Sequence, residues 1–475
     1  MAERATIPMR RGLILLGLLT ILGLSGGAAA AQGAPVILAP AERTTIFESL
    51  RGGDEIGRSP AASLSDTALW TALVRHATVE LAQRVRPSSV DELWAIDPPR
   101  RQVESEIEAA RAQGQLAAWI AVLPVANPRY RALLPVRDHY RAIVASGGWP
   151  EMPGGPTLRL GAVGPAVAVL RSRLGVEGYL SARLPGDTLD AAVGAALVDF
   201  QSHHDLQPDG SVGPATREAL NVPAAQRLAQ IEATLERWRW IRSFPPNRIE
   251  VDVGAAEATL YVGDVAQLPM RIIVGDPKHK TPMFISRMSS VVFNPPWIVP
   301  ASIDVKELSP KERAHPGYFA ANGFSRVDGV LQQAPGPKNS LGQVKFDFPS
   351  PFGVYLHDTP ARSLFARPVR TLSHGCMRVE KPRELAAALL GTQGWTRERV
   401  DTAIAAASTQ RVQLSQTTPL FVFYQTVAVR DDGSLQFHPD TYGWDAKLMM
   451  ALGAKDAVIS AIPHPETECG APKSP

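Results

Sequence analysis

Residues 373–378, Ser-His-Gly-Cys-Met-Arg, hold the side chains best suited to covalent chemistry in this chain. Cys376 lies 19 residues after another histidine, His357. A cysteine attacks a carbonyl as its thiolate, and a neighbouring imidazole is the usual way to form one near neutral pH. We therefore expect Cys376 to be a nucleophile ionised by His357, its general base. This pattern indicates acyl transfer through a thioester.

The backbone around the cysteine could stabilise the charge that acyl transfer creates. Gly375 has no side chain, so a substrate carbonyl can approach the main chain there. The consecutive N–H groups of Gly375 and Cys376 are the expected oxyanion donors. His374 has three open roles: it could line the oxyanion hole, touch the substrate or support the loop.

The segment Tyr355-Leu356-His357-Asp358 is expected to be a strand. Side chains alternate between the two faces of a strand, so the carboxylate of Asp358 points away from the imidazole. A main-chain carbonyl near 358 is then the better partner to orient His357. Tyr355 shares a face with His357 and is a candidate substrate contact.

Three more residues are candidate substrate contacts. The guanidinium of Arg378 is a planar fork that suits a carboxylate, although a surface salt bridge is its alternative role. Ser373 precedes the cysteine in the motif. Trp297 could contact substrate or pack in the core. Cysteine and histidine also bind zinc, but no CxxC, HExxH or HxH pattern accompanies them, so no metal is expected.

One spacing resembles the signature of the L,D-transpeptidases of bacterial cell walls: His357 is followed, after fifteen residues, by Ser-His-Gly-Cys. Residues 281–284 (Thr-Pro-Met-Phe) and 294–300 (Asn-Pro-Pro-Trp-Ile-Val-Pro) look like the larger, scaffold-bearing members. The resemblance implies that Cys376 attacks the third, diaminopimelate-type residue of a tetrapeptide stem and that His357 protonates the departing D-alanine. The family often has Asn where Arg378 stands.

The resemblance leaves the acceptor of the acyl group open. A side-chain amine of a second peptidoglycan stem would give a 3→3 cross-link. Water would make the enzyme an L,D-carboxypeptidase or hydrolase, and a lipoprotein lysine would make it a protein-anchoring transpeptidase. The family also implies acylation by carbapenems, a β-lactam class, and needs no cofactor. A non-catalytic cell-wall-binding protein is the rival from another class.

Residues 156–222 resemble the three-helix peptidoglycan-binding domain. The resemblance rests on 158–161 (Leu-Arg-Leu-Gly), 200–206 (Phe-Gln-Ser-His-His-Asp-Leu) and 209–216 (Asp-Gly-Ser-Val-Gly-Pro-Ala-Thr). Such a module either binds stem peptides and glycan or serves as a spacer. His203 and His204 are adjacent and point apart on a helix, so we expect exposure to solvent and no metal.

The whole chain of 475 residues is expected to be a multi-domain α+β protein. It combines a mainly helical scaffold, the three-helix module and a β-rich, sandwich-like catalytic domain with a capping insertion. The expected segments are a signal peptide (1–31), a flexible leader (32–44), a helical scaffold (45–150), the binding module (156–222), a linker helix (223–247), the catalytic domain (248–440, with a cap at 301–350) and a C-terminal segment with a flexible tail (441–475).

Export is expected from residues 1–31, where Arg10 and Arg11 precede a short apolar run and an A-x-A cleavage pattern. This predicts a periplasmic protein, with membrane attachment only if the signal is not cleaved. The chain has two cysteines, and a disulfide between Cys376 and Cys469 is the alternative to a free nucleophile. The net charge of +3 does not indicate nucleic-acid binding. Along 223–247, Arg237 and its neighbouring arginines are expected on the solvent side.

Overall fold

The computed structural model describes residues 36–51, 63–81, 84–98, 101–123, 125, 127–181, 186–430 and 432–454. The chain divides into two compact units, residues 1–73 and 74–475, and each is described by itself. The expected signal peptide lies outside the described residues. No helix in the described ranges is both long and apolar enough to cross a bilayer.

The first unit contains α1 (Pro40–Leu50) and the beginning of α2 (Asp66–Leu81). Proline at the first helical position has a φ already suited to a helix, so α1 begins at Pro40. The carboxylate of Glu42 accepts a hydrogen bond from Ala39 N (2.8 Å), which satisfies a free donor at that end. The leader expected over 32–44 therefore does not extend past residue 39.

The second unit has a helical layer joined to a large sheet. Helix α10, predicted as a linker, is buried on most sides and packs against α6 and α16. The strand β1 (Trp94–Ala95) comes from the expected scaffold and pairs in parallel with β5 of the catalytic sheet. Part of the expected scaffold, including Trp94 and Tyr140, therefore shares one core with the linker helix, the expected catalytic domain and α16. The helices of this layer are α3 (Pro87–Val90), α6 (Pro128–Ala145), α10 (Ala224–Trp240) and α16 (Trp444–Ala451). Two further helices, α4 (Val103–Ala112) and α5 (Leu116–Ala121), pack on each other.

A buried ion pair joins α10 to α16. Arg237 Nη1 lies 2.6 Å from Asp445 Oδ1, and the two side chains are 1% and 3% exposed. The guanidinium also lies over the ring of Tyr424, 5.2 Å from its centroid. The expectation that Arg237 faces solvent is wrong, because α16, which the sequence did not predict, covers that side of the helix.

The peptidoglycan-binding-like module has three helices, as expected. They are α7 (Pro165–Val176), α8 (Ala191–Ser202) and α9 (Pro214–Leu220). Their apolar faces form a core separate from the main one. The side-chain amide of Gln201 is buried and donates to Asp209 Oδ1 (2.9 Å), which holds the turn between α8 and α9.

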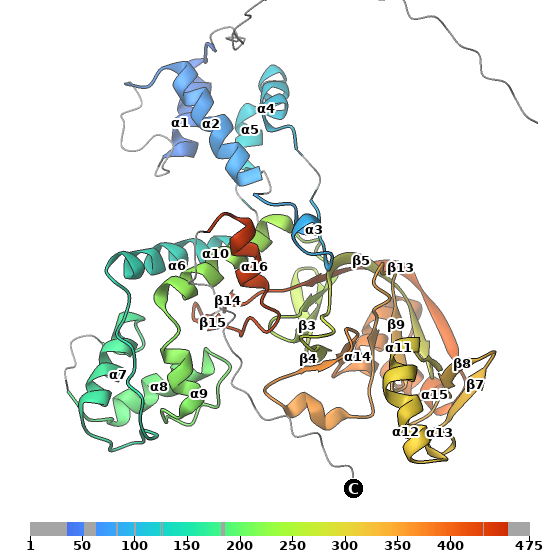
Figure 1. Ribbon diagram of the computed structural model, residues 1–475. Coiled ribbons are helices and arrows are strands. Elements are labelled where there is room, and N and C mark those ends of the chain that lie inside the picture. Colours follow the sequence, from blue (N-terminus) through green and yellow to red (C-terminus); the bar gives the residue numbers. More distant parts are fainter. Residues whose placement is uncertain are drawn as a thin grey trace, which may run out of the picture. The chain divides into compact units, whose positions relative to one another are not determined.

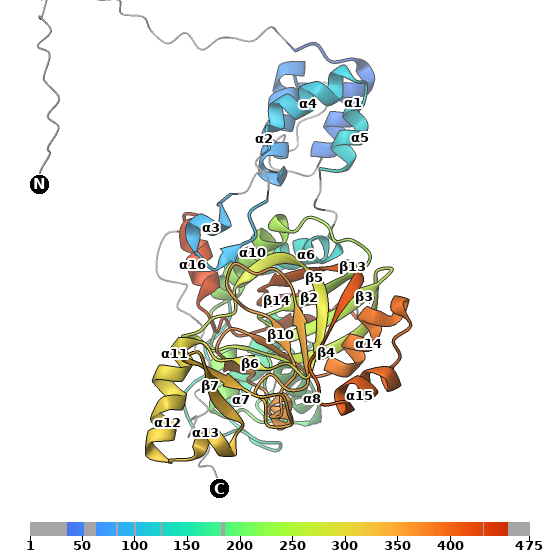
Figure 2. The same ribbon diagram turned by 90° about the vertical axis from the view of Figure 1, so that its right-hand side faces the viewer.

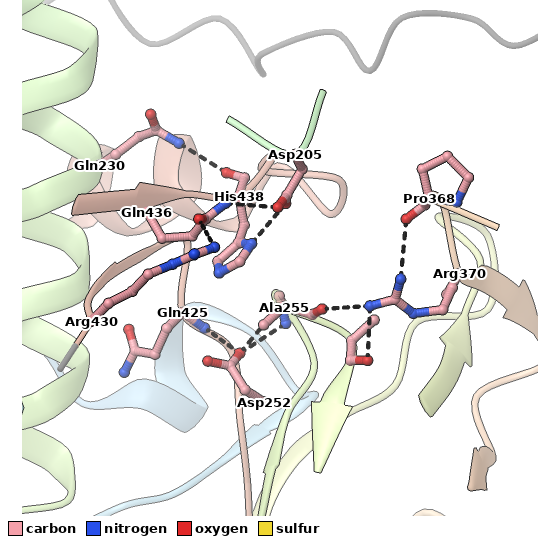
Figure 3. A network of polar contacts seen from close by, with 12 residues as sticks. Asp205, Gln230, Asp252, Ala255, Pro368, Arg370, Gln425, Arg430, Gln436 and His438 are labelled. Carbon is pink, nitrogen blue, oxygen red and sulfur yellow. Dashed lines mark hydrogen bonds and ion pairs between the residues drawn. The ribbon is translucent and has the colours of Figure 1, made fainter. Parts of the chain in front are cut away.

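The module docks on the hairpin of β14 (Val427–Val429) and β15 (Leu435–Phe437). Figure 3 shows Asp205 facing this hairpin: its carboxylate accepts from Gln436 Nε2 and lies against His438 Nδ1, both at 2.7 Å. His204 is 5% exposed and stacks between Phe200 and Phe437. Contact with the hairpin thus buries His204, and the expectation of solvent exposure is wrong for it.

The sheet of the expected catalytic domain closes on itself. Its order is β5-β13-β2-β3-β4-β12-β10-β9, and β9 also pairs with β5. The expected two-layer sandwich is therefore a closed sheet, in which neither layer has a free edge strand. The strands are β2 (Arg248–Asp252), β3 (Glu257–Val262), β4 (Val265–Gly275), β5 (Met283–Phe293), β9 (Val344–Asp347), β10 (Leu356–His357), β11 (Thr371–Ser373, paired with β4), β12 (Met377–Val379) and β13 (Gln410–Phe423), with α14 (Pro382–Leu390) and α15 (Arg397–Ala405) following β12.

The cap is a small lobe with its own core. Figures 1 and 2 show α11 (Ala301–Ile303), α12 (Ser309–Ala314) and α13 (Tyr318–Ala321) beside β7 (Phe324–Val327) and β8 (Val330–Gln333). A π-helical turn, Asp304–Leu308, joins the first two helices, and β6 (Trp297–Ile298) completes a three-stranded sheet. Since β9 belongs to the main sheet, the cap ends before Val344 and is shorter than the expected 301–350.

Replacement of Asp445 by alanine should destabilise the second unit by about 3–5 kcal/mol, because Arg237 would remain as a buried charge without its partner. The matched control is Glu232→Ala on α10, whose pair with Arg141 is half exposed, so a loss within about 1 kcal/mol is expected. Urea unfolding followed by tryptophan fluorescence measures both changes. Arg237→Met with Asp445→Leu should recover most of the loss. Equal effects of Asp445→Ala and Glu232→Ala would contradict burial of the pair.

Candidate active site

Two short parallel strands bring the predicted site together. Leu356 of β10 pairs with Met377 of β12, and His357 pairs with Arg378. Leu356 and Met377 are fully buried in the core. Alternation then sends His357 and Arg378 to the opposite face. On that face they line a groove of about 600 Å³ together with Tyr355, Ser373, His374, Cys376 and Trp297.

The imidazole of His357 is held by the main chain. Its Nδ1 lies 2.6 Å from the carbonyl oxygen of Asp358. A carbonyl can only accept, so Nδ1 carries the proton and Nε2 is left as the basic nitrogen. The carboxylate of Asp358 turns away and accepts from Gln343 N (2.9 Å) and Arg362 Nη1 (3.1 Å). This is the geometry expected from strand alternation.

Burial disfavours a charge on either reacting group. It lowers the pKa of His357 to about 3, and the nearby Arg378 cation acts in the same direction. Burial raises the pKa of the Cys376 thiol. Hydrogen bonds from the main chain and the hydroxyl of Tyr355 lower this pKa, but their effect is smaller than that of burial. The described contacts include no hydrogen bond between the sulfur and the His357 ring. These pKa shifts favour a neutral pair over the expected resting thiolate, and we expect proton transfer to accompany attack on a substrate.

The loop before the cysteine is held by its own hydrogen bonds. Ser373 Oγ donates to Cys376 O (2.6 Å) and accepts from Gly375 N (3.2 Å). Gly375 has φ +100°, a conformation that favours glycine. Its N–H is already used, in contrast to the expected pair of oxyanion donors. Among the described contacts, the Cys376 N–H has no acceptor and remains the available donor.

Further hydrogen bonds, which the sequence analysis did not predict, hold this loop in place. Thr281 Oγ1 donates to Gly375 O (2.9 Å) and accepts from Gly275 N (2.9 Å). Tyr442 OH donates to Gly275 O (2.6 Å) and accepts from Thr281 N (3.2 Å). Thr281 belongs to a run that the sequence analysis singled out, but nothing in the sequence indicated its link to Tyr442, which is 161 residues away.

His374 faces the cap. Its Nε2 lies 2.7 Å from Glu307 Oε1, and the two side chains are 38% and 40% exposed. Its ring is tilted against that of His279, with centroids 4.6 Å apart. The contacts of His374 thus connect the cysteine loop to the cap.

Arg378 is a cation aimed at the groove. It is largely buried, and no carboxylate among the described residues forms an ion pair with its guanidinium; Nε has no hydrogen-bond partner there either. The alternative of a surface salt bridge is therefore not observed. Trp297 reaches the groove from β6 and packs against Phe324 of the cap, with ring centroids 6.2 Å apart.

Cys376 is a free thiol. Its alternative partner, Cys469, lies outside the described residues. The described part of the chain contains no group of three or more histidine, cysteine or acidic side chains arranged to hold a metal ion.

Comparison with known families agrees with this geometry. Residues 246–429 match the YkuD family model, the L,D-transpeptidase catalytic domain, and residues 163–220 match the model of a peptidoglycan-binding domain. The residues that match the catalytic-domain model include the β-rich part of the chain that carries Cys376 and His357.

A relative extends the similarity beyond these domains. Over 297 residues the chain is 35% identical to a Haemophilus influenzae protein whose name provisionally assigns it to the L,D-transpeptidases. The match covers 58% of this chain and 59% of that protein, so the chain spans less than two thirds of its relative.

Two solved structures are similar only in part. L,D-transpeptidase 3 from Mycobacterium tuberculosis, in complex with a faropenem-derived adduct, is 15% identical and covers 38% of this chain and 60% of its own, with a TM-score of 0.21. An L,D-transpeptidase from Mycobacterium smegmatis is 16% identical, covers 37% and 58%, and also has a TM-score of 0.21. Scores this low do not establish a shared overall arrangement.

Alkylation of resting Cys376 should show a neutral thiol. Because burial raises its pKa, the rate with iodoacetamide should rise roughly tenfold per pH unit from pH 7 to beyond the ordinary value of about 8.5. His357→Gln should leave this profile unchanged. Mass spectrometry of a Cys469→Ser variant measures the rate at Cys376 alone. A plateau by about pH 6 that His357→Gln removes would instead indicate a preformed thiolate–imidazolium pair.

Proposed function

We propose that this protein is a cysteine-dependent L,D-transpeptidase that forms 3→3 cross-links in peptidoglycan through a thioester. The observation that carries the proposal is one groove in which three groups come together: a free thiol, an imidazole whose Nδ1 is held by a main-chain carbonyl, and an arginine without an ion-pair partner among the described residues. The match of residues 246–429 to the catalytic-domain family supports the same chemistry.

In the proposed acylation, Cys376 attacks the carbonyl at the L-centre of the third residue of a tetrapeptide stem. The thiol proton passes to His357 Nε2 as the C–S bond forms. The oxyanion accepts a hydrogen bond from the Cys376 N–H. The C–N bond to the terminal D-alanine then breaks, and its nitrogen takes the proton from His357. Burial of both groups makes this transfer concerted with attack.

The carboxylate-bearing side chain of the donor stem is the proposed partner of Arg378. A buried cation without a partner is costly, and an incoming carboxylate offsets that cost. Tyr355 and Trp297 line the same groove and are proposed to contact the stem. We also propose that β-lactams such as carbapenems acylate Cys376, because their strained amide would react with the same nucleophile.

Other outcomes of the same thioester remain as alternatives. Water would yield a carboxypeptidase or hydrolase, and a lipoprotein lysine would yield protein anchoring. The module at 156–222 is proposed to hold the enzyme on the wall in the periplasm, after export by residues 1–31; the match of 163–220 to a peptidoglycan-binding family supports this. A non-catalytic wall-binding protein would bind sacculi without acylation.

Cys376→Ala should abolish both muropeptide dimers and the covalent carbapenem adduct, because Cys376 alone carries a thiol among the described residues that line the groove. Binding to isolated sacculi should stay nearly unchanged. Digestion of muropeptides after incubation, with intact-mass measurement of the adduct, provides the test. Wild type that gains no adduct and makes no dimer or tripeptide would contradict the enzymatic proposal.

Arg378→Met should lower kcat/KM for tetrapeptide donors roughly 10- to 150-fold, from the loss of about 1.5–3 kcal/mol of charged hydrogen bonding. A donor whose side-chain carboxylate is amidated should react equally with wild type and variant. Arg367→Met, which removes an exposed arginine outside the groove, is the matched control. The same loss with both donors would argue that Arg378 supports the fold and does not bind the carboxylate.

A further inference from the structure

The cap places one carboxylate in the catalytic groove. Glu307 lies on the π-helical turn Asp304–Leu308, a backbone form often found at functional sites. Of the described residues that line the groove, Glu307 alone is acidic, against the cations Lys311, Lys338 and Arg378. A groove built solely for the carboxylates of a donor stem would gain nothing from this negative charge.

Lys311 follows Glu307 by four residues and lines the same groove. The cap therefore presents an acid and a base together to the substrate. A carbon that bears both an ammonium and a carboxylate is the complementary ligand, since each of its charges meets an opposite one. A water molecule or a lysine side chain offers no such pair of charges.

We propose that Glu307 and Lys311 bind the amino-acid head of the acceptor, the ammonium on Glu307 and the carboxylate on Lys311. The inference rests on the proposed transpeptidase function and deepens it, because it assigns the cap residues that select the acceptor. That acceptor is a stem whose side chain ends in an amino-acid group, as in diaminopimelate. The two residues are specificity determinants of the second half-reaction.

The present partner of Glu307 is easily exchanged. The Glu307–His374 contact is half exposed on both sides, and such a pair contributes about 0–1 kcal/mol. An incoming ammonium can therefore take the carboxylate at little cost. His374 keeps its tilted ring contact with His279, whose Nδ1 lies 3.1 Å from Asp276 Oδ1, so the cysteine loop retains this support.

The proton balance of the aminolysis is simple. The acceptor enters as an ammonium and loses one proton to solvent through the half-exposed Glu307–His374 pair. Its nitrogen then attacks the thioester carbonyl, and the C–N bond forms. The second proton passes to His357 Nε2 and on to the Cys376 sulfur as the C–S bond breaks. One amide, one thiol and one released proton are the products.

The test uses the full chain with one donor tetrapeptide and two acceptor tripeptides that carry diaminopimelate or lysine at the third position. Wild type should have a KM roughly tenfold or more lower for the diaminopimelate acceptor, as expected for one charged contact. Lys311→Met should remove this preference and leave the lysine acceptor unaffected. Glu307→Gln should raise KM for both acceptors roughly tenfold and shift products from dimer to hydrolysed tripeptide.

Two controls separate acceptor binding from support of the fold. Lys306→Met and Asp328→Asn remove matched charges from exposed cap positions that do not line the groove, and neither should change the acceptor KM. Carbapenem acylation and the donor KM should be unchanged in Glu307→Gln and Lys311→Met. Slower acylation or a higher donor KM in these variants would overturn the assignment, because the pair would then support the cap or bind the donor.

The proposed function and the acceptor site fail in different ways. Wild type that releases tripeptide but never dimer would overturn the acceptor site and leave the thioester chemistry standing. If wild type forms dimers but Lys311→Met keeps the preference for the diaminopimelate acceptor, the role assigned to Lys311 is wrong. Wild type without any acylation would remove the proposed function and this site with it.

Discussion

The register between β10 and β12 is the constraint on which the site depends. Leu356 and Met377 pair and are buried, so their neighbours face the groove together. A slip of one residue would place His357 in the core and turn a leucine toward substrate. The burial of two apolar side chains, each contributing about 1.5–3 kcal/mol, thus fixes the position of the chemical groups.

The same burial determines how the dyad can work. A groove that excludes water strengthens the interactions of the transition state, but it also disfavours every charge at rest. The pKa of the thiol is raised and that of His357 is lowered, so the neutral pair is the stable form before substrate binds. The hydrogen bond from Nδ1 of His357 to the carbonyl of Asp358 leaves Nε2 as the nitrogen that can accept a proton. Because a carbonyl is neutral, this orientation adds no charge to the site.

The sequence predicted best those features that depend on local pattern. The motif residues share the groove, the orienting carbonyl is that of Asp358, and the three helices of the binding module form as expected. Features that depend on long-range contacts were missed. Arg237 and His204 were expected in solvent, but α16 and the β14–β15 hairpin cover them. No local periodicity reports which distant segment will cover a helix face.

The cap illustrates why specificity can be separated from stability in this chain. Its own core consists of four buried side chains, Val299, Leu308, Phe324 and Leu331, and is separate from the large core under the sheet. A lobe held by so few apolar contacts can open at lower free energy than the closed sheet. The cysteine loop does not rely on it, since Thr281 and Tyr442 hold that loop from the main domain. Residues of the cap can therefore select an acceptor while the nucleophile keeps its geometry.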